Sequence, residues 1–363
     1  PNAEPPEQDD AIIARALRRS LVGFAIALVV GGIVFALLNR PDDAPETVEP
    51  ELRQLETREV PVEIPGVRFT DITREAGIDF VHENGAAGEK LLPETMGGGC
   101  AFFDYDNDHD PDILFVKGKR WPWDERAAAD TPATLSLYRN EGGGRFTDVT
   151  GDAGLGISLY GMGVATGDYD NDGWVDLFIS CVGEDRLLRN AGGKFVDQTA
   201  EAGVAGAAEA WGTSCGFFDY DNDGLLDLFV CNDVKWSRQI DLNQDFRLTG
   251  IGRAYGRPTN FEGAFCSLYR NTGDGKFADV SAGAGIQMKN HLTGVPMAKA
   301  LGLAPADLDG DGWIDLVVAN DTVQNFVFHN QGGKSFDEVG AMAGVAFDSE
   351  GAARGAMGID IAM

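Results

Sequence analysis

The chain has 363 residues, of which 58 are acidic and 29 basic, giving a formal net charge of −29. With 44% hydrophobic residues it can bury a core, which excludes disorder of the whole chain. The acidic balance argues against nucleic acid as a partner, because binding a phosphate backbone requires concentrated positive charge. The histidines form no HExxH pattern and the cysteines no CxxC pair, which argues against the usual zinc and haem sites.

An apolar segment without any charged residue lies near the N-terminus, from Leu21 to Leu38. At about 1.5 Å per residue, a helix over this segment would be roughly 27 Å long, close to the thickness of a membrane core. Arg15, Arg18 and Arg19 precede the segment and only Arg40 follows it. Because positive residues stay on the cytoplasmic side, we predict a single-pass anchor in the cytoplasmic membrane with a cytoplasmic N-terminus.

The resulting organisation has four parts. We predict a cytoplasmic tail over residues 1–10, an anchor helix over 11–40, a Pro- and Glu-rich linker over 41–66, and a periplasmic or otherwise extracytoplasmic domain over 67–363. A cleaved signal peptide is the alternative for the N-terminal segment, because its Arg-Arg pair resembles a twin-arginine signal. No convincing small-x-small cleavage site precedes the Pro-rich segment.

The rest of the chain repeats one pattern four times. Small residues, a short apolar strand, an Asp-rich loop and a second apolar strand occupy residues 97–116, 161–179, 212–230 and 300–318. A third strand ending in Asn and a fourth beginning with Phe follow each time, the latter at Phe146, Phe195, Phe277 and Phe336. Four short strands per repeat are typical of propeller blades, so we predict an all-β propeller with second strands buried on both faces.

The Asp-rich loops carry the predicted chemistry. In DYDNDGWVD, aspartates occupy positions 1, 3, 5 and 9, and Gly173 at position 6 allows the positive φ of a sharp turn. Hard oxygen ligands in this number suit Ca²⁺. The predicted ligands are Asp104, Asp106, Asp108 and Asp112; Asp168, Asp170, Asp172 and Asp176; Asp219, Asp221, Asp223 and Asp227; and Asp307, Asp309, Asp311 and Asp315. The alternative is that these Asp-rich turns are solvated and bind no ion.

The first of these loops departs from the pattern, because His109 stands where the others have glycine. A non-glycine residue with positive φ costs about 1 kcal/mol. Among up to four Ca²⁺ sites, we therefore predict this one to be the weakest, misfolded or empty.

The combination GxGxAFFDYDNDGxxDLFVxN, LYRN and GxFxDVT resembles the FG-GAP/VCBS repeats of integrin-α-like β-propellers, and more closely the bacterial ASPIC/UnbV relatives of cartilage acidic protein. The resemblance covers residues 67–363. It implies about seven blades with calcium in the Asp loops, and adhesion or assembly rather than a reaction. Phe69–Thr73 matches a fourth strand and residues 355–363 resemble an opening strand, so we expect the chain to belong to a longer polypeptide.

Two long insertions separate second from third strands, at residues 117–135 and 234–265. Basic and aromatic residues gathered in loops are typical of recognition surfaces. They are Lys117, Lys119, Arg120, Trp121 and Trp123 in the first insertion, and Lys235, Trp236, Arg238, Phe246, Arg247, Arg253, Tyr255 and Arg257 in the second. The alternative is that these arginines pair with neighbouring acids and the aromatic residues cover blade edges.

These features predict a non-enzymatic scaffold or adhesion subunit that binds a protein partner. A larger membrane complex is one assembly to which such a subunit could belong. No catalytic acid–base pair is recognisable, so no catalytic residue is assigned. The alternative is a carbohydrate-binding or polysaccharide-lyase-type propeller with a glycan ligand. Cys231 and Cys266 could form a disulfide in an oxidising compartment, and the sequence leaves this open.

Overall fold

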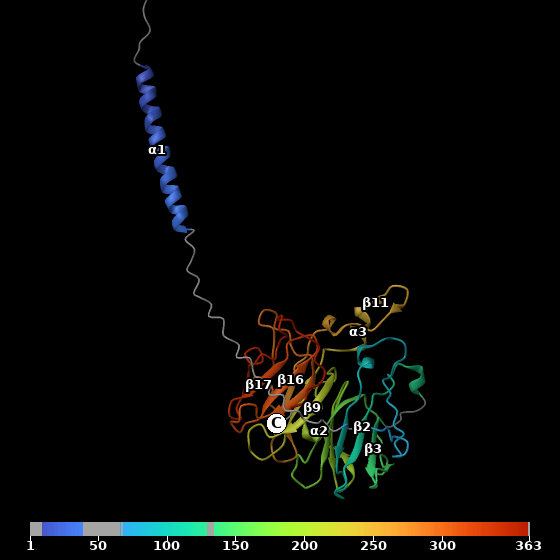
Figure 1. Ribbon diagram of the computed structural model, residues 1–363. Coiled ribbons are helices and arrows are strands. Elements are labelled where there is room, and N and C mark those ends of the chain that lie inside the picture. Colours follow the sequence, from blue (N-terminus) through green and yellow to red (C-terminus); the bar gives the residue numbers. More distant parts are fainter. Residues whose placement is uncertain (1–8, 39–65, 67, 129–133, 362–363) are drawn as a thin grey trace, which may run out of the picture. The chain divides into compact units, whose positions relative to one another are not determined.

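A computed structural model describes residues 9–38, 66, 68–128 and 134–361 of the chain (Figure 1). These residues fall into two compact units, divided between Phe69 and Thr70. The first unit contains the helix α1 (Asp9–Leu38). Among the helices of the described residues, none is both long and apolar enough to cross a membrane. The predicted span over Leu21–Leu38 is therefore not supported, and the predicted tail and linker lie almost entirely outside the described residues.

The second unit is built from antiparallel four-stranded sheets, each of which is one blade with its strands in chain order. The blades are β1 (Cys100–Phe103), β2 (Asp112–Val116), β3 (Leu135–Asn140) and β4 (Phe146–Asp148); β5 (Gly161–Gly167), β6 (Asp176–Cys181), β7 (Arg186–Asn190) and β8 (Phe195–Asp197); β9 (Gly212–Phe218), β10 (Asp227–Asn232), β13 (Ser267–Asn271) and β14 (Phe277–Asp279); and β15 (Ala300–Ala306), β16 (Asp315–Asn320), β17 (Phe326–Asn330) and β18 (Phe336–Glu338). Four such blades confirm the all-β repeat predicted from the sequence.

Short elements precede the first blade, connect the blades or belong to the insertions. They are the helices α2 (Thr199–Ala202) and α3 (Arg238–Gln244), the hairpin of β11 (Arg247–Leu248) and β12 (Gly252–Arg253), and the 3-10 helices at Leu92–Thr95, Glu125–Ala128 and Pro258–Asn260. Ser237 caps α3, since its hydroxyl accepts a hydrogen bond from the Ile240 amide at 3.3 Å. The second insertion is therefore an ordered α/β segment.

The blades pack face to face through their apolar residues. Every residue of β6, β10 and β16 is buried, which confirms the prediction that second strands are covered on both faces. Separate hydrophobic clusters join the first blade to the second, the second to the third and the third to the fourth. The innermost strands β1, β5, β9 and β15 contact one another in chain order. This order is compatible with the blades of a propeller, and the sheets of the described residues do not form a closed ring.

Both predicted closing segments lack strand structure. Phe69–Thr73 contains only coil and a turn, and the described residues 355–361 are irregular. The latter nevertheless lie beside the fourth blade, where the Ala356 amide donates to the Asn320 carbonyl at 3.1 Å. All five cysteines are free thiols, including the buried Cys231 and Cys266.

Candidate metal centres

Each Asp loop joins the first and second strands of its blade, and the aspartate at position 1 fixes the loop's shape. Asp168 Oδ1 accepts a hydrogen bond from the Asp172 amide at 3.0 Å, and its Oδ2 accepts one from the Gly173 amide at 2.8 Å. The equivalent pair of bonds is made by Asp104, Asp219 and Asp307. The repeated sequence thus folds into one repeated turn.

Two positions of the turn have left-handed backbone. Position 6 is Gly173 in the second loop, with φ of 90°, and position 4 is Asn171, with φ of 56°. In the first loop, His109 adopts the same conformation with φ of 73°, and its amide still donates to Asp104 Oδ2 at 2.9 Å. The prediction that this loop is misfolded is therefore wrong, because the fixed hydrogen bonds hold histidine in a conformation that glycine adopts more easily.

The aspartate at position 9 ties the loop to the third strand. Asp176 is fully buried, and its Oδ1 and Oδ2 accept hydrogen bonds from the amides of Asn190 (2.7 Å) and Tyr169 (3.1 Å). Burial raises the pKa of Asp176 and of Asp227 to about 7, and that of Asp112 to about 6. A nearby cation would offset the cost of ionising these carboxyl groups.

In three of the four loops, the aspartate at position 3 has an oxygen that no group of the described residues satisfies. The Oδ1 atoms of Asp106, Asp170 and Asp221 are buried, and none receives a hydrogen bond from the described residues. A buried carboxylate oxygen without a donor is costly, and a hard cation is the group that would satisfy it. The residues present therefore fit a calcium ion.

The structure brings three carboxylates of each loop close enough to share an ion. Their ligand atoms lie within 4.8 Å of one another in the groups Asp104, Asp106 and Asp108; Asp168, Asp170 and Asp176; Asp219, Asp221 and Asp227; and Asp307, Asp309 and Asp315. Four of the sixteen predicted ligands, Asp112, Asp172, Asp223 and Asp311, lie outside these groups. Asp311 instead forms a group with Asp309 and His329.

Basic residues on the third strands were missed by the sequence analysis. Arg189 approaches Asp170 Oδ2 through Nε and Asp172 Oδ2 through a terminal nitrogen, both at 2.5 Å. Arg270 pairs with Asp221 at 3.3 Å. The sequence signal for these partners is the residue before the Asn that ends each third strand. This residue is Arg in three repeats and His in the fourth.

The other two blades use this position differently. Arg139 pairs with Glu141 at 2.6 Å. His329 Nδ1 lies 3.1 Å from Asp315 Oδ1, and this hydrogen bond raises the pKa of His329. The four loops therefore share the same turn but differ in the contacts of the basic side chain on the third strand.

Asparagine side chains link each loop to its neighbour. Asn190 of the second blade donates from Nδ2 to the Tyr105 carbonyl of the first loop at 2.8 Å, and Asn107 of the first loop donates to the Gly173 carbonyl at 3.0 Å. Equivalent bonds join the second loop to the third and the third to the fourth. A change in one loop is thus coupled to the next blade.

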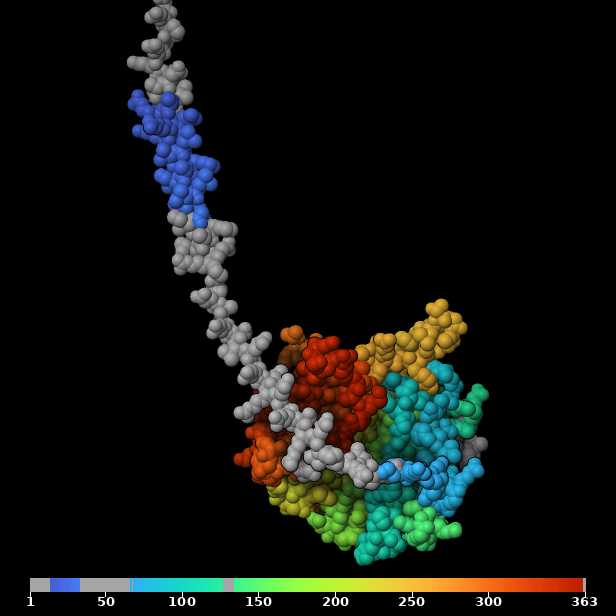
Figure 2. All heavy atoms as spheres, in the orientation of Figure 1, coloured from blue at the N-terminus to red at the C-terminus, as the bar shows by residue number. Residues whose placement is uncertain are grey.

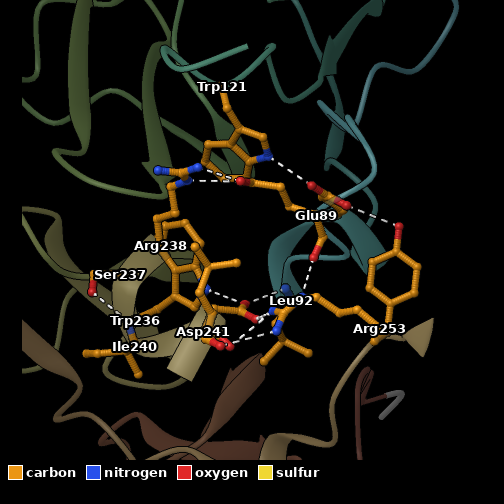
Figure 3. A network of polar contacts seen from close by, with 12 residues as sticks. Glu89, Leu92, Trp121, Trp236, Ser237, Arg238, Ile240, Asp241 and Arg253 are labelled. Atoms are coloured by element: carbon orange, nitrogen blue, oxygen red, sulfur yellow. Dashed lines mark hydrogen bonds and ion pairs between the residues drawn. The ribbon is translucent and has the colours of Figure 1, made fainter. Parts of the chain in front are cut away.

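The two insertions follow the second strands β2 and β10, at the ends of these strands away from the Asp loops. They pack against each other through Trp121 of the first and Trp236 of the second (Figure 3). Trp121 stacks on Trp123, Tyr160 and Trp236, with ring centroids 5.1, 4.4 and 5.2 Å apart. Arg238 lies over the Trp123 ring, 4.9 Å from its centroid, and pairs with Glu89. Trp121 and Arg238 thus follow the alternative interpretation, in which the arginines pair with neighbouring acids and the aromatic residues cover blade edges.

Two buried acids complete this network. Asp241 accepts hydrogen bonds from the Leu92 amide (2.7 Å), Trp236 Nε1 (2.8 Å) and Arg253 (2.8 Å). Glu94 accepts from Trp121 Nε1 and from the Tyr255 hydroxyl, both at 3.1 Å. Burial raises the pKa of Glu94 despite these donors. Every carboxylate oxygen of both acids is thus paired, unlike those of Asp106, Asp170 and Asp221 in the Asp loops.

Comparison with known proteins identifies the repeats. A family model described as an FG-GAP-like repeat matches residues 123–179, 168–230 and 259–318. The chain therefore carries three FG-GAP-like repeats within a unit of propeller-type β-sheets. The finer resemblance to the ASPIC/UnbV group has no such match. No curated protein matches the chain significantly.

Two solved structures show a weak overall similarity to the chain. A lectin from Agrocybe aegerita that recognises non-reducing terminal N-acetylglucosamine shows 19% identity and a TM-score of 0.24, over 70% of this chain and 66% of that one. The chain thus spans slightly less than two thirds of the lectin's length. BBS1N, solved in complex with ARL6DN, shows 12% identity and a TM-score of 0.24, over 67% of this chain and 81% of that one. At this TM-score neither likeness carries an argument.

Proposed function

We propose that the protein is a calcium-binding β-propeller that acts as a protein-interaction or adhesion module and has no catalytic activity. The observation that carries the calcium assignment is the unpaired, buried Oδ1 at position 3 of three loops, with two further carboxylates within 4.8 Å. Interaction and adhesion are the roles suggested by FG-GAP-like repeats.

In this proposal calcium stabilises the assembly of blades as well as each loop. The Asp loops are hydrogen-bonded to one another through Asn190 and Asn107 and their equivalents. An ion that orders one loop therefore also orders the donors and acceptors of the next. Neutralising neighbouring carboxylates further removes repulsion within an acidic chain.

The partner surface that the geometry favours is the tip of the β11–β12 hairpin. Figure 2 shows this hairpin, in gold, projecting from the surface of the second unit. Its tip exposes Ile251 (75%) and Leu248 (46%). Trp121, Trp236 and Phe261 of the insertions are buried and Trp123 is only 37% exposed, so these aliphatic side chains are the stronger candidates for contact with a protein, including a membrane-complex subunit.

The calcium part is tested by thermal unfolding of the full chain after metal removal, in excess chelator and in excess CaCl₂. We expect a clear rise in melting temperature with calcium and a smaller one with magnesium, which tolerates fewer protein oxygen ligands. The same melting temperature in chelator and in calcium would overturn the assignment.

The interaction part is tested with the double variant Leu248→Ser/Ile251→Ser in co-purification from native membranes and extracts. We expect the variant to lose a partner that wild type retains, with an unchanged melt. A matched control is Leu292→Ser, which alters an exposed leucine outside both the hairpin and the Asp loops. Retention of every partner by the double variant would exclude the hairpin tip.

Several sequence predictions remain untested. Attachment to the cytoplasmic membrane with the propeller outside would be tested by fractionation and protease protection of the full chain. Glycan binding or lyase activity would be tested by glycan screening with product detection. The calcium proposal depends on neither.

A further inference from the structure

A second candidate site lies at the opposite end of the strands from the Asp loops. A cleft of about 810 Å³ opens between the second and third blades, lined by the turn after β6, the loop that follows α2, and the segments at either end of the second insertion. None of the predicted calcium ligands lines it. Its chemistry is therefore independent of the metal centres.

Two polar side chains that line this cleft are incompletely paired. Asp185 is 2% exposed; its Oδ1 accepts from the Cys181 amide at 2.8 Å, but its Oδ2 receives no hydrogen bond from the described residues. Asn232 donates from Nδ2 to the Phe265 carbonyl at 2.9 Å, whereas its buried Oδ1 has no donor. Both lone acceptors belong to residues that line the cleft.

Glycine keeps the carboxylate accessible. A Cβ on Gly206 would lie 3.1 Å from Asp185 Oδ2, and the backbone there has φ of 68°. A larger residue at this position would cover the carboxylate. The loop over Asp185 is thus shaped to leave space at the unpaired oxygen.

The remaining lining sets the charge and polarity of a ligand. Glu209, Glu262 and Asp279 are exposed acids at the cleft, against the single base Lys235. The walls are otherwise mainly apolar, contributed by small alanines and by Phe265 and Tyr269. A ligand that combines positive charge with an aliphatic chain matches this composition.

We propose that this cleft binds a primary ammonium group carried on an aliphatic chain, with Asp185 Oδ2 and Asn232 Oδ1 as its acceptors. A free diamine and the lysine side chain of a partner protein present the same chemistry. An ammonium donates three hydrogen bonds and accepts none, so it matches the two unpaired acceptors, Asp185 Oδ2 once ionised and Asn232 Oδ1.

The electrostatics of the free protein agree with this assignment. Burial raises the pKa of Asp185 to about 8, because few groups near it stabilise its ionised form. A bound ammonium would supply that stabilisation. A calcium ion is a poorer match, since it requires six or more oxygen ligands, whereas Asp185 Oδ2 and Asn232 Oδ1 are two acceptors.

The test is calorimetric titration of the calcium-saturated full chain with 1,5-diaminopentane and, separately, with acetyl-Gly-Lys-Gly-amide. We expect saturable binding of at least one probe, weakened at least tenfold by Asp185→Asn and several-fold by Glu209→Gln. Binding of the diamine alone identifies a free amine as the ligand, and tighter binding of the peptide identifies a protein lysine.

Controls separate this result from a loss of folding. Asp152→Asn changes an exposed acid away from the cleft and should bind as wild type does. 1-Pentanol, which has the aliphatic chain without the charge, should not compete. Absence of saturable binding for both probes would overturn the proposal, as would unchanged affinity in Asp185→Asn and Glu209→Gln. Neither result would affect the calcium assignment, which is measured without an amine.

Discussion

Two sets of buried acidic residues differ in how their carboxylate oxygens are paired. At the insertion end, Asp241 and Glu94 are buried with a donor on each carboxylate oxygen. At the Asp-loop end, Asp170 and its equivalents keep an oxygen that is buried and unpaired. Both ends are rich in acids, so charge alone does not identify a metal site. The unpaired oxygen distinguishes a group that awaits a ligand from one that holds the fold together.

The largest expected effect comes from breaking the paired end. Asp241→Ala removes the acceptor of the Leu92 amide, Trp236 Nε1 and Arg253, and leaves the guanidinium without its buried partner. We expect a loss of about 3–5 kcal/mol in the free energy of unfolding, measured by denaturant titration in excess calcium. Asp245→Ala is the matched control, because that aspartate pairs with Arg247 at the surface. Equal losses in both variants would contradict the role given to Asp241.

The second prediction concerns pH and sharpens the contrast. Burial raises the folded-state pKa of Asp176 and Asp227 to about 7 and of Asp112 to about 6, above their ordinary unfolded value near 4. Their contribution to stability is therefore complete below about pH 4 and is lost as pH rises through 6 to 7.

We expect the melting temperature of the metal-free chain to fall between pH 5 and pH 8, and the increase caused by calcium to grow over the same range. Asp185 and Asp233, whose pKa values burial raises to about 8 and about 7, add to the fall without responding to calcium. A calcium-induced increase that is larger at pH 5 than at pH 8 would contradict this reasoning.

The third prediction compares two arginines at equivalent positions. Arg189 contacts Asp170 and Asp172, and thus competes with a metal ion for the second loop. Arg189→Gln should raise the calcium affinity of that loop several-fold, equivalent to about 1 kcal/mol. Arg139→Gln should change affinity less, because Arg139 pairs with Glu141. Calorimetric titration of both variants checks the difference, and a larger effect in Arg139→Gln would reverse the interpretation.

The smallest expected effect is at His109. His109→Gly relieves a left-handed histidine while keeping the amide that donates to Asp104. We expect the metal-free chain to gain up to about 1 kcal/mol in the free energy of unfolding. Gly173→His places the same strain in the second loop and should cost a similar amount. Destabilisation by His109→Gly would mean that the imidazole itself contributes to the first loop.

How much the sequence could predict follows the same division. The blades and the Asp loops were predictable because their contacts are local: Asp168 bonds to amides four and five residues away. The sequence could not decide how the insertions are paired, because their contacts are non-local: Tyr255 donates to Glu94, 161 residues away in the chain. The basic partners of the loops were missed because Arg189 and Arg270 lie on third strands, and the strand pattern does not indicate that they contact the loop aspartates. The fold of the first loop was misjudged from the strain at His109 alone.

The most direct test of the calcium assignment is the number of ions bound by the metal-stripped full chain, measured by calorimetric titration with CaCl₂ at pH 7.5. The account predicts at least three equivalents, and it predicts that Asp170→Asn binds one fewer than wild type, because it neutralises the carboxylate whose Oδ1 is buried and unpaired. Wild-type protein that binds no calcium, or an Asp170→Asn variant that binds as many ions as wild type, would contradict it.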